Sequence, residues 1–467
     1  MGASILDPAA AVGERARSDP ESAAIHWGAS VWCYEELWGR IDARGRHLVA
    51  AGLEAGELVS VAFRHGPDYV VDLLAVWWAG GAVAPLHPRG TATEEQHAEQ
   101  LFRPRFHINP SGLVVPGRQA KHALRFAPED GVGVCIATSG SSGLPRGIVL
   151  THSGFMTSAT AAQRRLGLVA GDRWGLVLSV AHVGGMSTVI RAMYLGAALH
   201  LSSGFDAPAL AHSILDGRVT HVSLVPSMLA SLIDHGVVSP PKTFGCALVG
   251  GAHTPPGLLQ RAAEAQIPIA LTWGMTETTA QITTAPPELV LRVPGTVGAA
   301  LDFLEVHADD SGRLGVRGPT LAHRIIEGPG ADPVPLPLDD GGWFRTQDRG
   351  RIDPEGLVWV EGRVDAVIVS GGVNVDPREV EGVLSEASGV REVAVFGRPD
   401  EKWGQIIAAA VVMRVGDTST ASDLHRHCRG RLTRGKCPSH IVIVPELPRT
   451  PSGKLAYGRL ADFLESN

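Results

Sequence analysis

Residues 138–147 have the sequence Thr-Ser-Gly-Ser-Ser-Gly-Leu-Pro-Arg-Gly, and this stretch decides how the rest of the chain is interpreted. Apolar runs flank it at 132–137 and 148–150, so we expect a loop between two strands. Glycines let backbone N–H groups approach an anion, and the hydroxyls and the guanidinium add further donors. The stretch therefore predicts a phosphate-binding loop, with an ordinary surface loop as the alternative. Its candidate residues are Thr138, Ser139, Gly140, Ser141, Ser142, Gly143 and Arg146.

The loop fits neither of two common nucleotide-binding fingerprints. The pattern G-x-x-x-x-G-K-[ST] needs a Lys followed by Ser or Thr, and G-x-G-x-x-G needs a helix that begins at the glycines. Here no Lys-Ser or Lys-Thr follows, and no helix clearly begins at the glycines. The chain is predicted to contain neither a Walker loop nor a Rossmann fingerprint.

Four further motifs follow the loop in a fixed order. They are Trp273-Gly274-Met275-Thr276-Glu277-Thr278, Gly342-Trp343-Phe344-Arg345-Thr346-Gln347-Asp348, Gly362-Arg363-Val364-Asp365 through Glu381, and Pro448-Arg449-Thr450-Pro451-Ser452-Gly453-Lys454. Together the five segments resemble the adenylate-forming (AMP-binding) superfamily of acyl-CoA synthetases, aryl-CoA ligases and peptide-synthetase adenylation domains. The resemblance spans nearly the whole chain. It implies an AMP-forming acid–thiol ligase that activates a carboxylic acid with ATP as an acyl-adenylate.

Composition limits the partners that the chain is expected to have. The formal net charge of −7 is small for 467 residues, which argues against a nucleic acid or an anionic membrane as partner. No apolar run reaches the ~20 residues that span a bilayer. The five cysteines form no C-x-x-C pair, which suits a reducing compartment. We expect a soluble cytoplasmic protein; its oligomeric state stays open, and a homodimer is allowed.

The pattern along the chain predicts the α/β class. Strand-like and helix-like stretches alternate, as at 58–63, 68–78 and 82–85. The apolar stretch 69–86 predicts a buried helix followed by a strand, 313–360 predicts turns and short strands, and 421–432 predicts a helix. We expect a large multi-subdomain N-terminal domain of layered sheets and helices at 1–362 and a small mobile α+β C-terminal domain at 366–467. By the resemblance, residues 363–365 form the hinge between them, with Asp365 at its pivot; an ordinary turn is the alternative.

The resemblance assigns catalytic roles to four residues. Lys454 would contact both the reacting carboxylate and the α-phosphate, where a lost contact typically costs ~10²–10³ in rate. Thr276 and Glu277 share a loop, and the Glu277 carboxylate would bind the Mg²⁺ that accompanies ATP. Arg363 would hold the ribose or its phosphate.

Further nucleotide contacts follow from the same resemblance. Asp348 would accept hydrogen bonds from the ribose, and Trp273 would stack on adenine, with core packing as its alternative. Gly274 and Met275 belong to the same motif, and Gly250, Gly251 and Ala252 would let backbone approach the base. Two positions depart from the family pattern: Arg146 replaces a Lys and changes the donor geometry, and Gln347 replaces a Gly before Asp348 and narrows the pocket.

The acceptor of the acyl group is expected to be CoA. The segment Ser370-Gly371-Gly372-Val373-Asn374-Val375 resembles the part of CoA ligases that lines the thiol tunnel, with Gly371 and Gly372 suited to close backbone approach. A carrier-protein thiol or an amine stays open as an alternative acceptor.

The acid itself is indicated by three further runs, at 181–186, 225–232 and 274–283, which look most like o-succinylbenzoate-CoA ligases of menaquinone biosynthesis. Such an aromatic dicarboxylate needs a cation for its second carboxylate, and Arg191 is our candidate, with Ser187 and Thr283 nearby and His182 as a gate. A surface arginine and a core histidine are the alternatives. Another aryl, acyl or amino acid, or an inactive nucleotide-binding protein, also stays open.

Overall fold

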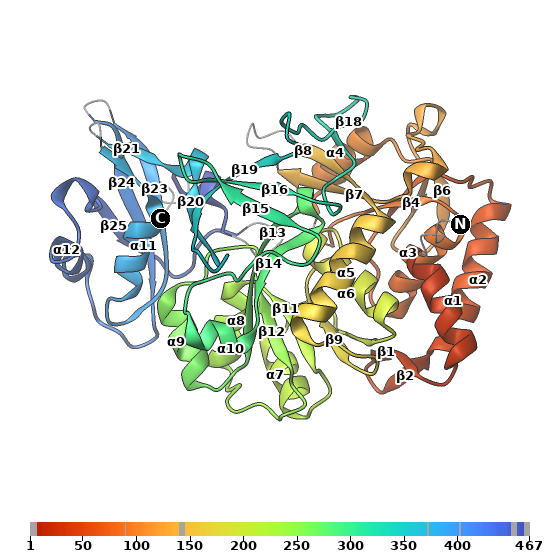
Figure 1. Cartoon of the computed structure of the whole chain (residues 1–467), viewed down its shortest axis with the longest axis horizontal. Coiled ribbons are helices and arrows are strands. Elements are labelled where there is room, and N and C mark those ends of the chain that lie inside the picture. Colours follow the sequence, from red (N-terminus) through yellow and green to blue (C-terminus); the bar gives the residue numbers. More distant parts are fainter. Residues whose placement is uncertain are drawn as a thin grey trace.

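The predicted α/β class is confirmed by the computed structural model, which describes residues 7–88, 90–139, 145–370, 373–400, 403–449 and 455–461. Within these ranges the strands form four sheets (Figure 1). The same ranges contain no helix that combines the length and the apolar character needed to cross a membrane. The boundary between the two expected domains, with its hinge at 363–365, stays a prediction.

The first eight-stranded sheet is mainly parallel, with antiparallel strands at its two edges. In spatial order its strands are β14 (Ala280–Ala285), β13 (Ile269–Met275), β12 (Cys246–Val249), β11 (His221–Leu224), β9 (Arg173–Leu176), β10 (Ala198–Leu201), β1 (Ala23–Trp27) and β2 (Ser30–Cys33). The four-residue runs of β11 and β12 are buried throughout, which is typical of strands covered on both faces.

The second eight-stranded sheet contains the strands on either side of the predicted phosphate loop. Its strands, in spatial order, are β18 (Val334–Pro335), β17 (Arg324–Ile326), β8 (Pro145–Thr151), β7 (Val132–Ser139), β4 (Ala82–Pro85), β3 (Leu58–Val61), β5 (Phe106–Ile108) and β6 (Val114–Pro116). β7 and β8 pair antiparallel from Val132↔Thr151 to Ser139↔Pro145. The two strands expected around residues 138–147 are therefore confirmed.

Helices pack on the two large sheets, and α5 contacts strands of both, namely β7, β8 and β14. Its neighbour α6 packs on β9, β10, β11 and β14 of the first sheet. The helices of this part are α1 (Pro8–Ser18), α2 (Tyr34–Ala50), α3 (Pro67–Trp78), α4 (Ala92–Phe102), α5 (His152–Leu166), α6 (Val183–Leu195), α7 (Ala207–Leu215), α8 (Pro226–Asp234), α9 (Pro256–Glu264) and α10 (Pro287–Arg292).

A third, smaller sheet precedes the C-terminal part of the chain. Its antiparallel strands are β15 (Glu305–Ala308), β16 (Arg313–Arg317), β19 (Phe344–Ile352) and β20 (Val358–Arg363). They account for much of the stretch 313–360, which the sequence predicted to be rich in turns and short strands. The 3₁₀ turn η4 (Val364–Ala366) follows β20 directly.

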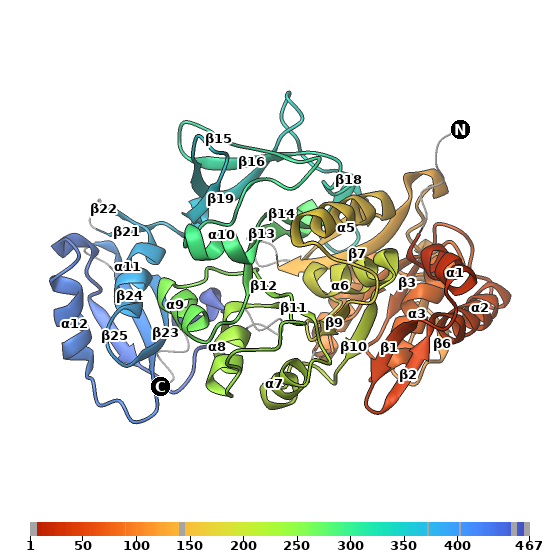
Figure 2. The same ribbon diagram turned by 60° about the horizontal axis from the view of Figure 1, so that its bottom comes forward.

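The fourth sheet forms the C-terminal unit, which Figures 1 and 2 show at the opposite end of the molecule from α1 and α2. Its elements are β21 (Ile368–Ser370), β22 (Val373–Val375), α11 (Pro377–Ser385), β23 (Val390–Asp400), β24 (Gly404–Met413), α12 (Ala421–Arg429) and β25 (His440–Ile443). The sequence predicted the second helix as far as Leu432, but α12 ends at Arg429, because Gly430 is a poor helix former. α11 contacts α9 and β20 of the preceding part.

The most apolar stretch of the sequence, at 69–86, is a buried helix followed by a strand, as predicted. It forms most of α3 and then β4, and Asp72 is its one buried acid. The Asp72 carboxylate accepts from Arg44 Nε at 2.8 Å and from Arg64 Nη1 at 2.7 Å. Two guanidinium groups therefore neutralise a carboxylate that is only 1% exposed.

Replacing Asp72 with Ala should lower the free energy of unfolding by about 3 kcal/mol, because Arg44 and Arg64, both partly buried, lose the buried carboxylate that they share. Urea denaturation of the purified protein measures the change. The matched control is Asp42→Ala, which removes an ion pair with Arg46 that is largely exposed to solvent and should cost about 0.5 kcal/mol or less. Equal losses in the two variants would contradict the assignment.

Candidate active site

A cavity of about 1040 Å³ lies where the sheets meet, and most of the predicted nucleotide-binding residues line it. The first sheet contributes the chain that follows β12 and β13, the second contributes the two sides of the β7–β8 loop, and the third contributes β19 and β20. The predicted residues among its lining are Thr138, Arg146, Gly251, Ala252, Trp273, Gly274, Met275, Thr276, Glu277, Asp348 and Arg363.

The carboxyl ends of two parallel strands form one wall, as is usual for ligand sites in open α/β sheets. Gly250, Gly251 and Ala252 follow β12 directly, and Gly251 has a positive φ of 77° that favours glycine. On β13, a Cβ at Gly274 would lie 1.5 Å from the carbonyl oxygen of Ala280. Only glycine therefore permits the close approach of β13 and β14 next to the cavity.

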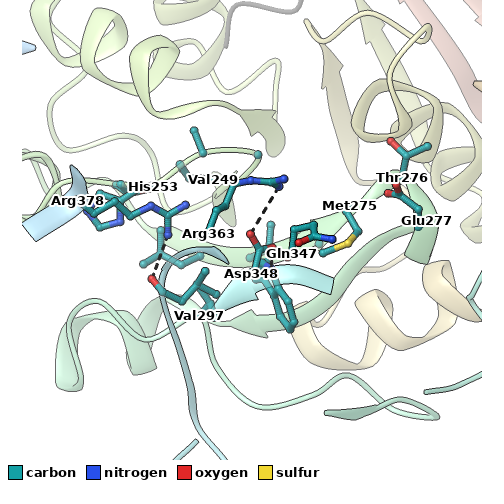
Figure 3. A pocket seen from close by; sticks show the side chains of 18 of the residues that line it. Val249, His253, Met275, Thr276, Glu277, Val297, Gln347, Asp348, Arg363 and Arg378 are labelled. Carbon is teal, nitrogen blue, oxygen red and sulfur yellow. Dashed lines mark hydrogen bonds and ion pairs between the residues drawn. The ribbon is translucent and has the colours of Figure 1, made fainter. Parts of the chain in front are cut away.

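The turn after β13 presents Thr276 and Glu277 at one end of the cavity (Figure 3). It is the 3₁₀ turn η3 (Thr276–Thr278), and Thr279 and Ala280, which follow it, have positive φ values of 52° and 81°. Such backbone strain in consecutive non-glycine residues is typical of functional sites. The turn is held in place because the N–H of Ala322 donates to the Glu277 carbonyl at 2.8 Å.

Glu277 is suited to a metal that is bound mainly by phosphate and water. In the described part of the chain, no group of three or more His, Cys, Asp or Glu side chains could hold a metal ion. Mg²⁺ commonly uses only one or two protein carboxylates together with substrate phosphates. The Glu277 carboxylate, which lines the cavity, fits that pattern.

Asp348 and Arg363 face each other because of strand register. They are direct partners in the antiparallel pairing of β19 with β20, and Arg363 Nη1 lies 3.9 Å from Asp348 Oδ1 (Figure 3). The other carboxylate oxygen accepts from the indole N–H of Trp273 at 2.7 Å. The carboxylate is thus oriented from two sides and lines the cavity beside a cation.

Trp273 has a different environment from the one that adenine stacking requires. Its side chain is 6% exposed and packs with Ile282, Leu301 and Leu314 in an apolar cluster. This favours core packing, the alternative that the sequence left open. Its contribution to the site is the hydrogen bond that orients Asp348.

Several predicted residues lie outside the described parts of the chain. They are Gly140, Ser141, Ser142 and Gly143 of the phosphate loop, Gly371 and Gly372 of the thiol tunnel, and Lys454. The backbone of Ser139 ends β7, and that of Asp365 lies in η4. Of the two family departures, Arg146 and Gln347 both line the cavity.

Arg191 is buried in α6, so the surface-arginine alternative is wrong. The residue is 2% exposed, and its Nη2 donates to Gln281 Oε1 at 2.5 Å. Its guanidinium carbon lies 4.7 Å from the ring centroid of Trp174, and within the described structure Nε and Nη1 have no hydrogen-bond partner. Burial lowers the pKa of the guanidinium to about 10, which leaves it protonated at neutral pH.

Two further predicted acid-pocket residues also contain a polar atom without a hydrogen-bond partner in the described structure. Ser187, one turn earlier on α6, and Thr283 on β14 are buried, and their hydroxyl oxygens have no partner among the described residues. α6 and β14 are in contact. His182 is the N-cap residue of α6, and its ring lies 5.2 Å from that of His87. These four residues do not line the large cavity.

A chain of polar groups connects Arg191 with the cavity. Gln281 Nε2 donates to Thr284 Oγ1 at 2.8 Å, and Thr284 Oγ1 lies 3.3 Å from Oγ1 of Thr272, which lines the cavity. Neither Gln281 nor Trp174 was assigned a role from the sequence alone. Gln281 and Thr283 are two residues apart on β14, and alternate residues of a strand share a face. This spacing could have indicated that Gln281 lies on the same side of the strand as Thr283.

His253 and Arg378, which no sequence motif singled out, line the opposite end of the cavity (Figure 3). His253 directly follows Gly250-Gly251-Ala252, and desolvation at the cavity wall together with the charge of Arg378 lowers the pKa of its imidazole. Arg378 comes from α11, so the C-terminal unit contributes a cation to the cavity wall.

Known proteins resemble this chain along nearly its whole length. It is 34% identical over 462 residues to the 2-succinylbenzoate–CoA ligase of Listeria monocytogenes serotype 4b, covering 96% of this chain and 98% of the relative. Its structure matches o-succinylbenzoate CoA synthetase from Bacillus subtilis in complex with the acyl-adenylate intermediate, at 26% identity and a TM-score of 0.83, covering 96% and 97% of the two chains. The same synthetase in complex with ATP and magnesium matches at 26% identity and a TM-score of 0.82, covering 96% and 98%.

Two family models cover most of the sequence. One, described as AMP-binding enzyme, matches residues 12–129 and 115–324. The other, described as AMP-binding enzyme C-terminal domain, matches residues 379–454. Together with the cavity and its Glu277, Asp348 and Arg363 side chains, these matches show that the chain belongs to the AMP-binding enzyme family.

Proposed function

We propose that this protein is an ATP-dependent ligase that joins an o-succinylbenzoate-like aromatic dicarboxylic acid to CoA through an acyl-adenylate. Its relatives include a 2-succinylbenzoate–CoA ligase and an o-succinylbenzoate CoA synthetase, which supports both the reaction type and the acid. The observation that carries the choice of acid is the buried guanidinium of Arg191, whose Nε and Nη1 lack partners within the described residues. Its small-molecule partners are then the acid and CoA.

A buried cation is costly unless an anion or several acceptors compensate it. Gln281 occupies Nη2 alone, so Nε and Nη1 keep N–H groups that can donate to a bound carboxylate. The buried hydroxyl groups of Ser187 and Thr283 are further donors. A monocarboxylic acid would leave this guanidinium uncompensated, which favours a substrate with a second carboxylate.

In the first half-reaction the other carboxylate of the acid attacks the α-phosphorus of ATP, and pyrophosphate leaves. Positioned charges supply most of the catalysis in such a transfer. Asp348 would hold the ribose, Arg363 the sugar or its phosphate, and Lys454 the reacting carboxylate and the α-phosphate. Thr276 and Glu277 would face the triphosphate, whose Mg²⁺ neutralises charge when bound and would be held by the Glu277 carboxylate.

In the second half-reaction the CoA thiol loses its proton, its sulfur attacks the acyl carbon and AMP leaves. Gly371 and Gly372 would line the path of the thiol. The C-terminal unit, residues 366–467, would rotate about the hinge at 363–365, with Asp365 as pivot. We place the protein in the cytoplasm because its five cysteines suit a reducing compartment.

Replacing Arg191 with Ala should raise KM for o-succinylbenzoate by at least about 30-fold, because it removes the buried partner of a carboxylate. KM for ATP should change little. Steady-state kinetics with coupled pyrophosphate detection measures both constants. The control Arg164→Ala removes an exposed arginine that pairs with Asp302 and should leave both constants unchanged. Equal increases for acid and ATP would remove Arg191 from the acid pocket.

Replacing Lys454 with Ala should slow adenylate formation by about 10²–10³, because a charge at the transferred phosphate is lost. Pyrophosphate release measures this step. Thioester formation from supplied acyl-adenylate should be largely retained, and Lys436→Ala, which alters the lysine paired with Glu379, should retain both activities. If the Lys454 variant loses both half-reactions, the lysine has a structural role instead.

Replacing Asp348 with Asn should raise KM for ATP by about tenfold, since a hydrogen bond to a charged group contributes about 1.5–3 kcal/mol. The substitution keeps the shape of the side chain that Trp273 orients. Titration of ATP at saturating acid measures the effect, with the exposed Asp340→Asn as control. An unchanged KM for ATP would mean that Asp348 does not hold the nucleotide.

A further inference from the structure

Glu381 is a buried carboxylate that none of the roles above uses. It lies on α11 and is 7% exposed. Its Oε1 accepts from the backbone N–H of Val395 on β23 at 2.9 Å and from the hydroxyl of Tyr457 at 2.8 Å. One carboxylate oxygen therefore ties a helix, a strand and the chain near the C-terminus together.

Tyr457 lies three residues after Lys454 and begins the 3₁₀ turn η6 (Tyr457–Arg459). The chain on either side of residues 450–454 is joined by a β-bridge between Arg449 and Leu455 and by a hydrogen bond from Ala456 N to Pro448 O at 2.9 Å. Leu455 packs at the edge of an apolar cluster of the C-terminal unit. Tyr457 itself is 48% exposed, so packing alone fixes it weakly, and its hydroxyl contact with Glu381 sets its position.

The charges around Glu381 are few. Arg378 and Asp376 lie near it at the start of its own helix, with opposite effects on its charge. β23 contributes the Val395 N–H, while the α12 residue His427 bonds to the carbonyl of Val383 rather than to Glu381. Glu379, on the same helix, is exposed and pairs with Lys436. Among the described residues, the tyrosine hydroxyl is thus the one side-chain group that donates to the Glu381 carboxylate.

We propose that Glu381 and Tyr457 are positioning residues for adenylation, because their hydrogen bond fixes the chain that follows Lys454. The inference rests on the proposed function of Lys454 above. A misplacement of about 1 Å can cost up to 10²-fold in rate when a catalytic group must be aligned. The contact would therefore act on kcat of the first half-reaction rather than on binding of either substrate.

The protonation state of Glu381 gives this contact a measurable signature. Burial raises the pKa of the carboxyl group to about 7. The tyrosine hydroxyl bonds more strongly to the carboxylate than to the neutral acid. Adenylation should therefore become faster as pH rises through about 7, when the carboxylate forms.

The test compares the wild type with Tyr457→Phe, Glu381→Gln and the matched control Glu379→Gln. Acid-dependent ATP–pyrophosphate exchange with o-succinylbenzoate is followed from pH 6 to 8, and thioester formation from supplied acyl-adenylate is measured separately. We expect Tyr457→Phe and Glu381→Gln to lower kcat for exchange by about tenfold at pH 8 with KM values unchanged. Their dependence on pH near 7 should be lost, while Glu379→Gln should match the wild type.

Thioester formation should be unchanged in both variants, which separates positioning of the Lys454 segment from a general structural role. Wild-type pH dependence in Glu381→Gln, or equal losses in both half-reactions, would overturn the inference. Absence of exchange in the wild type with this and other acids would instead contradict the proposed function, so the two failures are distinguishable.

Discussion

The buried positive charge of Arg191 is the constraint on which the choice of substrate depends. The Arg191 guanidinium is removed from water, and the described structure gives it one neutral hydrogen-bond acceptor, Gln281 Oε1, and one aromatic face, Trp174. These two contacts fix the plane of the group and its rotation within that plane. They also leave the N–H groups of Nε and Nη1 without an acceptor among the described residues. An organic dianion would supply that acceptor at one end and a reactive carboxylate at the other.

The rest of the site follows from how the sheets meet. Parallel β12 and β13 end at the same edge and bring Gly251 and Glu277 to one cavity, although the two residues are well separated in sequence. The antiparallel register of β19 and β20 places Asp348 opposite Arg363. Trp273 links these two sheets, because it lies on β13 and donates to Asp348. Hydrogen bonding between sheets thus sets the geometry of this wall of the cavity.

Much of this arrangement was predictable from local sequence. Apolar runs bounded by glycine and proline predicted β7, β8, α3 and β4, because short buried elements consist mainly of apolar residues. The ordered motifs predicted which residues share the cavity. The helix expected to reach Leu432 ended at Arg429, where a single glycine outweighed the charged residues around it.

What sequence could not provide was the environment of individual side chains. The pattern placed Arg191 on a helix but left open which face it occupies, and only the packing of α6 against β14 shows that it is buried. The sequence did not distinguish Gln281 from other polar strand residues, and only the structure shows that it accepts a hydrogen bond from Arg191. Trp273 was expected to stack on adenine, with core packing as the alternative, and only the tertiary structure shows how it packs. His253 and Arg378 reach the cavity through tertiary contacts that no local motif encodes.

The central claim is that the buried guanidinium recognises a second carboxylate. Its most direct test is a competition in which o-succinylbenzoate and an analogue without the second carboxylate are offered together with ATP and CoA, and both thioesters are quantified by mass spectrometry. The account predicts that kcat/KM favours the dicarboxylate by at least about 10², because the analogue leaves buried donors unpaired. Equal use of the two acids, or a preference for the analogue, would contradict it.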